Sequence, residues 1–174
     1  MATSQPVPIQ KPGMIKGLSR GGLTSLLIAV FRERREGLCS EQDCRTVATY
    51  LIRLLTSHDK YVSGRKFKVF CSEEAYKLRP SISATEVDHA IPVKCLVDRM
   101  LLQPNDTDVA LELERGYYLV RLTKEEHKGL VHKDSMPAGW ETVPEDKVWM
   151  LRYQTVGNDP QINLMKGWID MDWK

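Results

Sequence analysis

The sequence contains no apolar run near the length of a membrane-spanning helix, which needs about 20 mainly apolar residues. Its first residues, Met1 to Pro12, are polar, contain prolines and lack the apolar stretch of a signal peptide. We therefore expect residues 1–13 to form a flexible tail, and we expect a cytoplasmic protein with no membrane partner. Internal repeats and low-complexity segments are also absent, which argues against a solenoid or a fibrous protein.

The four cysteines form no C-x-x-C pair. A structural zinc site usually needs such closely spaced thiolates, and disulfide scaffolds are small, secreted and cysteine-dense, so neither class is favoured. We expect four reduced and partly buried thiols. The sequence also lacks a P-loop, a dinucleotide-binding glycine fingerprint and the motifs of serine or cysteine nucleophiles. The cysteines are Cys39, Cys44, Cys71 and Cys95.

What the sequence does contain is an uneven distribution of charge. Residues 1–80 carry 14 Lys and Arg against 7 Asp and Glu, whereas residues 81–174 carry 11 against 16. A basic first half suits contact with a polyanion, and an acidic second half suits metal binding, although solvated helix faces can also be basic by chance. We divide the chain into a helical, basic N-terminal region at 14–80 and a second region at 81–174 that holds the candidate site.

Two amphipathic helices are expected in the basic region. The first spans about Leu18 to Glu36, with apolar residues at helical spacing and Gly37 as its stop. The second begins at Ser40, where Asp43 three residues later resembles a capping box. Because the link between the helices is short, we expect them to pack as an antiparallel pair. A short helix capped by Ser72 should follow before Pro80.

A basic segment interleaved with aromatic residues lies between these helices and the second region. Lys66, Phe67, Lys68 and Val69 alternate between basic and apolar, with Arg65 before them and Phe70 after. Such a segment could contact a phosphate backbone and stack on bases. The alternative is an edge strand that its lysines protect from aggregation.

The most informative pattern is an acidic residue directly before a histidine, with a second histidine downstream. Asp88 precedes His89, and His127 follows a predicted strand at 117–122 and a predicted helix start at Lys124, capped by Thr123 with Glu126. Asp88 and His127 offer oxygen and nitrogen ligands to a divalent metal, and a neighbouring imidazole can act as a base. In the alternative interpretation, Asp88 and His89 are an exposed pair on a helix that begins near Ser83.

The spacing of these residues resembles that of the HNH, or His-Me finger, nucleases over roughly residues 84–133. The resemblance implies a two-stranded element followed by a helix, with one metal ion (Mg²⁺, Mn²⁺ or Zn²⁺) between them. It also implies that His89 is the general base and that Asp88 and His127 are metal ligands. The family's middle residue is usually Asn, and its position falls on Tyr118. The Tyr118 hydroxyl could orient His89, the role could lie elsewhere, or the site could be inactive.

We accordingly predict an α+β fold, with the helical N-terminal region packed on a small ββα-metal core and a C-terminal covering segment. The predicted function is that of a metal-dependent endonuclease that cuts DNA, with RNA as the alternative substrate. Such small nucleases occur in bacteria and their phages. A homodimer is compatible with this function. Lys94, beside the Asp-His pair, and Arg121, on the second strand, are candidate phosphate contacts. The alternatives are a nucleic-acid-binding or regulatory protein on a degenerate HNH scaffold, and a protein-interaction domain.

Overall fold

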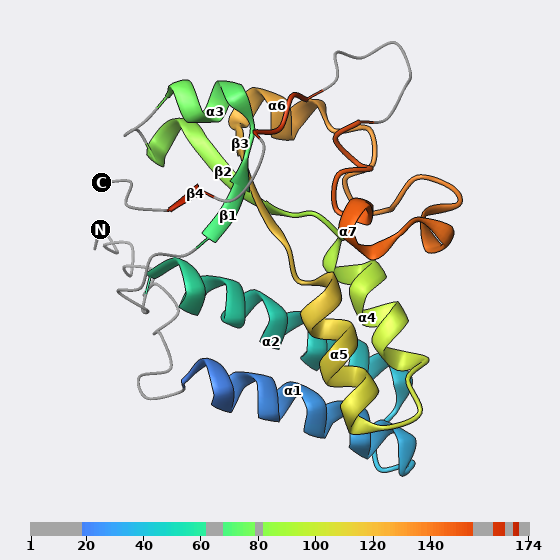
Figure 1. The fold of residues 1–174 in the computed structure, drawn as a ribbon. Coiled ribbons are helices and arrows are strands. Elements are labelled where there is room, and N and C mark those ends of the chain that lie inside the picture. Colours follow the sequence, from blue (N-terminus) through green and yellow to red (C-terminus); the bar gives the residue numbers. More distant parts are fainter. Residues whose placement is uncertain (1–18, 62–67, 79–81, 155–161, 166–168, 171–174) are drawn as a thin grey trace, which may run out of the picture.

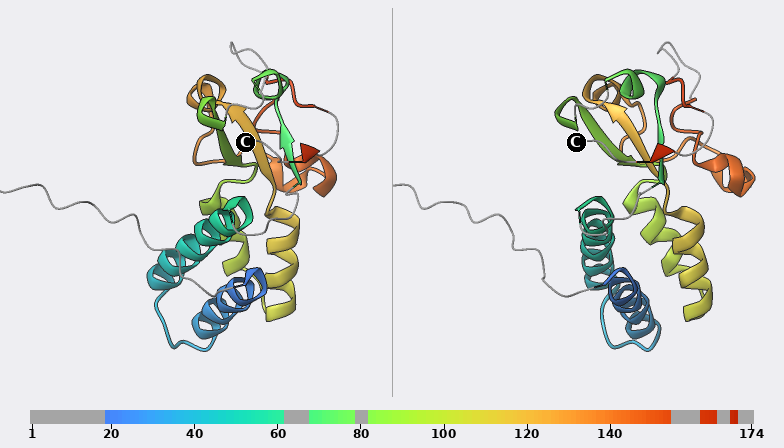
Figure 2. Two further views of the ribbon diagram at one scale, coloured as in Figure 1. Left: turned by 90° about the vertical axis from the view of Figure 1, so that its left-hand side faces the viewer. Right: turned by 60° about the vertical axis from the view of Figure 1, so that its left-hand side comes forward.

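A computed structural model describes residues 19–61, 68–78, 82–154, 162–165 and 169–170 of the chain. Two parts are visible in Figure 1, a group of long helices below and a small sheet with short helices above. The same separation holds in both views of Figure 2. The predicted α+β fold with a helical N-terminal region is therefore confirmed. Arg65 and Lys66 lie outside the described residues.

The two predicted N-terminal helices are present and pack against each other. Helix α1 spans Arg20–Arg35 and begins where the Ser19 hydroxyl accepts a hydrogen bond from the Gly22 amide at 3.1 Å. Gly37 follows with φ of 75°, a left-handed conformation that favours glycine after a helix end. Helix α2 spans Glu41–Tyr61. Their apolar stripes meet in the larger hydrophobic core, which includes Leu27, Phe31 and Ile52.

Two further helices complete this core, and one of them was not expected. The apolar spacing of Leu96, Met100 and Leu101 predicts a helix from Val93 to Leu102, and helix α4 spans Val93–Leu101. The polar residues at 104–108 predict a loop, but helix α5 spans Asp106–Gly116. The loop expected at 104–108 ends at Asn105, whose side chain accepts a hydrogen bond from the Asp108 amide at 2.9 Å and so caps α5. A Cβ on Gly116 would lie 2.5 Å from Leu96 Cδ1, so glycine permits the close approach of α5 to α4.

The sheet has the strand order β2-β3-β1-β4. Strand β2 spans Thr85–His89, preceded by a short 3₁₀ helix, η1, at Ile82–Ala84, so the alternative of a helix from Ser83 is wrong. It pairs antiparallel with β3, Leu119–Thr123. Strand β1, Lys68–Cys71, pairs parallel with β3 and antiparallel with β4, Ile169–Asp170. The sheet thus takes one strand from before residue 81 and three from after it.

Short helices flank the sheet, and their caps agree with the sequence. Helix α3, Glu73–Lys77, is capped by Ser72. Helix α6, Lys124–Gly129, begins with the predicted capping box between Thr123 and Glu126. The C-terminal segment forms a 3₁₀ helix, η2, at Trp140–Thr142 and helix α7 at Glu145–Val148. The sequence predicts a helix from Lys147 to Gln154, but α7 ends at Val148 and turns follow. Within the described residues, every helix is too short or too polar to cross a membrane.

Candidate functional site

The three residues of the Asp-His…His pattern line one pocket. Asp88, His89 and His127 all border a cavity of about 450 Å³. The pocket lies where the end of β2 meets α2, the start of α4 and helix α6. Side chains that are separated by 38 residues in the sequence are therefore brought to one place by the pairing of β2 with β3.

The position of His127 follows from the strand register. Thr123, the last residue of β3, pairs with Thr85, the first residue of β2. Helix α6 therefore begins beside the start of β2, and one helical turn carries His127 over that strand. Glu86 and Asp88 are two residues apart on β2 and share the face that His127 covers. The local cap and the strand pairing together fix the geometry of this site.

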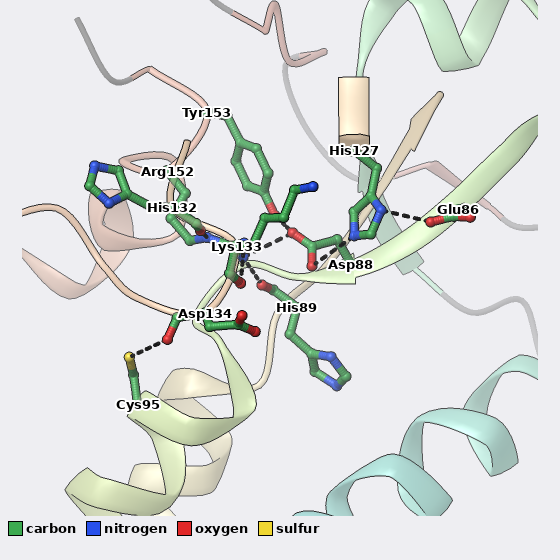
Figure 3. A network of polar contacts seen from close by, with 10 residues as sticks. All are labelled: Glu86, Asp88, His89, Cys95, His127, His132, Lys133, Asp134, Arg152 and Tyr153. Carbon is green, nitrogen blue, oxygen red and sulfur yellow. Dashed lines mark hydrogen bonds and ion pairs between the residues drawn. The ribbon is translucent and has the colours of Figure 1, made fainter. Parts of the chain in front are cut away.

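The ring of His127 lies between two carboxylates (Figure 3). Its Nε2 is 3.7 Å from Asp88 Oδ1. Two atoms bound to one zinc or magnesium ion, at about 2.0–2.2 Å each, can be no more than about 4.3 Å apart. The Asp88 and His127 side chains therefore lie within the span of a single divalent metal, as the resemblance requires.

Glu86, which the sequence analysis did not single out, orients His127 from the other side. Its Oε2 lies 2.7 Å from His127 Nδ1, within ion-pair distance. In a neutral imidazole this contact places the proton on Nδ1 and leaves the lone pair on Nε2, the nitrogen nearer Asp88. Metal-ligating histidines usually have such a carboxylate behind them. The sequence could have indicated Glu86, because it lies two residues before Asp88 and residues i and i+2 of a strand face the same side.

Arg152 and Tyr153, from the C-terminal segment, hold the other oxygen of Asp88. Arg152 Nη1 and the Tyr153 hydroxyl each donate to Asp88 Oδ2 at 2.9 Å. Burial raises the pKa of Tyr153 well above its usual value, and the nearby Asp88 charge adds to this, so the hydroxyl remains a donor. Asp88 Oδ1 is then the oxygen that faces His127. No local feature of the sequence indicated these contacts, which join residues more than 60 positions apart.

The Arg152 guanidinium is also the link between three backbone segments. It is 3% exposed, and it donates to the backbone carbonyls of His89, His132 and Lys133. The bond to His132 measures 2.7 Å and the bond to Lys133 2.9 Å. Arg152 therefore ties the end of β2 to the loop that forms the opposite wall of the pocket.

His89 points away from Asp88, toward helix α2 (Figure 3). Its Nε2 lies 2.8 Å from the Thr56 hydroxyl, which itself donates to the Ile52 carbonyl at 3.0 Å. Tyr117 also donates to the Thr56 oxygen, at 3.1 Å. With the hydroxyl proton of Thr56 directed to Ile52, the arrangement favours His89 Nε2 as the donor, which leaves the lone pair of a neutral ring on Nδ1. Thr56, on the N-terminal helices, thus sets the tautomer of His89.

Tyr117 lies beside the His89 ring, whereas the sequence predicted this position for Tyr118. The two rings meet edge to face with centroids 5.8 Å apart. Tyr118 packs in the second hydrophobic cluster, with its ring centroid 6.2 Å from Phe70 and 6.5 Å from that of Trp149. Both tyrosines lie between the end of α5 and the start of β3, and only Tyr117 contacts His89.

The predicted nucleic-acid contacts have different surroundings. Lys94, in the first turn of α4, is exposed and lines the pocket. Arg121 is a correction to the prediction: it is 4% exposed and donates to the Thr85 hydroxyl at 2.6 Å, so it stabilises the sheet rather than reaching a phosphate. Lys68 opens β1, but its side chain lies outside the described residues, as do Arg65 and Lys66.

The pocket also contains basic residues that the sequence analysis did not select. Arg45 and Arg53 from α2 line it on one side, and Lys133 lines it on another. Together with Lys94 they surround the site with positive charge, against the carboxylates of Asp88 and Asp134. This arrangement favours an anionic ligand near Asp88 and His127.

A metal ion at this site would have two protein ligands. In the part of the chain that the structure describes, no group of three or more His, Cys, Asp or Glu side chains is arranged around a common point. The His132 side chain, which lies apart from Asp88 and His127 in Figure 3, pairs with the Ser135 hydroxyl at 3.3 Å. A pair of ligands leaves several coordination positions to water or substrate oxygens, as is usual for Mg²⁺ in phosphate chemistry.

Comparison of the chain with protein-family models, curated proteins and solved structures finds no match.

Proposed function

We propose that the protein is a metal-dependent endonuclease of the HNH type, which hydrolyses phosphodiester bonds in DNA. The observation that carries the proposal is the 3.7 Å separation of Asp88 Oδ1 and His127 Nε2, with Glu86 bonded behind His127. The order of the elements also agrees with the resemblance: the Asp-His pair ends β2, β3 lies antiparallel to it, and His127 follows on α6. Helices α4 and α5 are inserted between the two strands.

A bound divalent metal would supply Lewis-acid stabilisation of the charge that develops on the phosphate and the leaving oxygen. Asp88 and His127 would hold it, with one lone pair on each ligand atom directed to it by Arg152, Tyr153 and Glu86. These supporting bonds keep the ligand atoms in place without the metal, so little reorganisation is needed when it binds.

His89 would act as the general base through Nδ1. Accepting a proton there gives an imidazolium whose Nε2 hydrogen is already bonded to the Thr56 oxygen. Thr56 and Tyr117 would thus perform the orienting role that the family assigns to the Asn at the position of Tyr118. Lys94 and Lys133, at the rim, would bind the non-bridging oxygens of the scissile phosphate or its neighbours.

The test is cleavage of supercoiled plasmid by the purified protein with Mg²⁺ or Mn²⁺, compared with EDTA. We expect metal-dependent nicking that His89→Ala and Asp88→Asn abolish while the proteins remain folded by circular dichroism. His132→Ala is the matched control, because this histidine lies away from the metal pair, and it should keep full activity. Equal nicking by the wild type and His89→Ala would contradict the proposal.

A second candidate function is nucleic-acid binding on a degenerate scaffold of the same kind. The observation that favours it is the placement of Tyr118, in the position of the family's Asn, within a hydrophobic cluster. Salt-sensitive binding of DNA without cleavage under any metal condition would support this function in place of the first.

A further inference from the structure

Helix α2 presents a polar face that continues the candidate site outward. A second hollow, of about 410 Å³, lies along this face. It shares three lining residues with the pocket that holds Asp88 and His127, so the two hollows are adjacent. The shared residues are Arg45, Thr49 and Arg53, and the others are Gln42, Thr46 and Tyr50. We call this surface the α2 groove.

The polar groups of the α2 groove recur at a regular interval. Arg45, Thr49 and Arg53 are successive i, i+4 neighbours on one helix, so they lie about 6 Å apart along its axis. Arg45 is fixed by ion pairs with Glu41, at 2.8 Å, and with Asp98 on α4. Arg53 is exposed, and among the described residues no carboxylate lies within ion-pair distance of it. The groove therefore offers one rigidly held guanidinium and one that is available to an anion.

An exposed aromatic residue lies between the two arginines. The Tyr50 side chain lines the outer hollow, and the residue is 55% exposed. Proteins that bind single-stranded nucleic acid combine a basic groove that follows the backbone with aromatic rings on which unpaired bases stack. The stacking is not sequence-specific, because every base has a π face. A duplex keeps its bases stacked inside and would not use Tyr50 in this way.

We propose that the α2 groove binds a single-stranded segment of the nucleic-acid substrate, with its phosphates on Arg45, Thr49 and Arg53 and a base stacked on Tyr50. The inference extends the proposed function, since it supplies a path for the strand that leaves the catalytic pocket. It concerns binding, however, and it can be measured without cleavage.

The test is fluorescence anisotropy of a labelled single-stranded oligonucleotide, and of the same sequence as a duplex, in EDTA over a range of salt concentrations. Arg53→Gln should weaken single-strand binding and reduce the slope of log affinity against log salt by about 0.7, the value for one phosphate contact. Arg115→Gln removes the same charge from an exposed position on α5 outside the groove and should leave the slope unchanged. Tyr50→Ala should weaken single-strand binding, Tyr50→Phe should retain it, and neither should affect the duplex.

The outcome separates this inference from the proposed function. Equal salt slopes for Arg53→Gln and Arg115→Gln overturn the inference, even if the wild type cuts DNA. Unchanged single-strand binding by Tyr50→Ala, or a wild type that binds no oligonucleotide in EDTA, also overturns it. Conversely, one outcome is that the wild type cuts no DNA while the variants change binding as expected. That result contradicts the endonuclease function but supports single-strand binding in the α2 groove.

Discussion

Each imidazole of the candidate site is bonded at one ring nitrogen by a side chain outside the Asp-His…His motif. Glu86 binds His127 and Thr56 binds His89, at 2.7 and 2.8 Å. These bonds decide which nitrogen of each ring carries its lone pair. At the scale of single residues, the chemistry therefore depends on two supporting groups as much as on the histidines themselves.

The first prediction concerns Glu86. Glu86→Gln replaces the charged acceptor behind His127, so we expect the affinity for Mn²⁺ to fall about 10- to 100-fold, measured by isothermal titration calorimetry. Glu125→Gln is the matched control, because Glu125 is an exposed residue in the first turn of α6. Similar Mn²⁺ affinities in the two variants would show that Glu86 does not support a metal ligand.

The second prediction concerns Thr56. Thr56→Val keeps the shape of the side chain but removes the oxygen that accepts from His89 and Tyr117. With the tautomer of the base no longer fixed, we expect kcat for DNA nicking to fall at least about tenfold, with little change in KM.

Thr56→Ser restores the acceptor oxygen and should recover most of kcat. A purely structural role for Thr56 would predict the opposite pattern, in which both variants lose activity in proportion to their loss of thermal stability.

At the scale of elements, the site depends on a segment that contributes none of Asp88, His89 and His127. The turns after α7 insert Arg152 and Tyr153 beside β2, and Arg152 bonds backbone carbonyls of two other segments. The second hydrophobic cluster holds the same segment, with the Trp149 ring stacked on Phe70 of β1 at a centroid distance of 3.5 Å. The sheet and the C-terminal segment thus stabilise each other.

The third prediction concerns Arg152. Its guanidinium is almost fully buried, and it donates hydrogen bonds to Asp88 and to three backbone carbonyls. Arg152→Met would leave these acceptors unpaired, and we expect the free energy of unfolding to fall by about 3–5 kcal/mol, measured by urea denaturation.

Arg53→Met serves as the control at an exposed arginine on α2 and should change stability by less than about 0.5 kcal/mol. If Arg152→Met unfolds at the same urea concentration as the control, the guanidinium does not hold these segments together.

At the scale of the whole molecule, two hydrophobic cores meet at the candidate site. The helices α1, α2, α4 and α5 enclose the larger core, and the sheet and C-terminal segment enclose the second. The pocket takes residues from both parts, with Arg53 from α2 and His127 from α6. The stability of the site is therefore coupled to that of the entire fold.

The fourth prediction concerns alkaline pH. Burial raises the pKa of Cys44 to about 11, and it also raises the pKa of Cys95 and Tyr153 above their usual values. In the unfolded chain these groups ionise at lower pH than in the folded chain, so their contribution to stability is complete below about pH 8 and is lost as the pH rises.

We expect the urea midpoint to be constant up to about pH 8 and to fall between about pH 9 and 11. Cys44→Ala should show a smaller fall over the same interval, because one of the titrating groups is absent. A midpoint that is independent of pH up to about pH 11 would contradict the burial of these groups.

The local features of the fold could be predicted from the sequence. Ser72 and Thr123 cap helices as expected, and the amphipathic patterns of α1 and α2 place apolar residues in the core. These signals are local, because a cap or an apolar stripe involves residues within one or two turns of each other. Helix α5 was missed although Asn105 is a good N-cap, since the polar segment around it also fits a loop.

The sequence by itself determined the α+β class, the caps and the Asp88, His89 and His127 pattern, because these follow from neighbouring residues and from the period of each element. Only the tertiary structure decided that Thr56, Arg152 and Tyr153 support the site, that Tyr117 rather than Tyr118 meets His89, and that Arg121 is buried. The physical reason is that these contacts join residues 28 to 65 positions apart, and which side chains meet depends on strand register and helix packing. A shift of one residue in that register would exchange the two faces of the strand, and no local pattern in the chain records which of them turns toward α2.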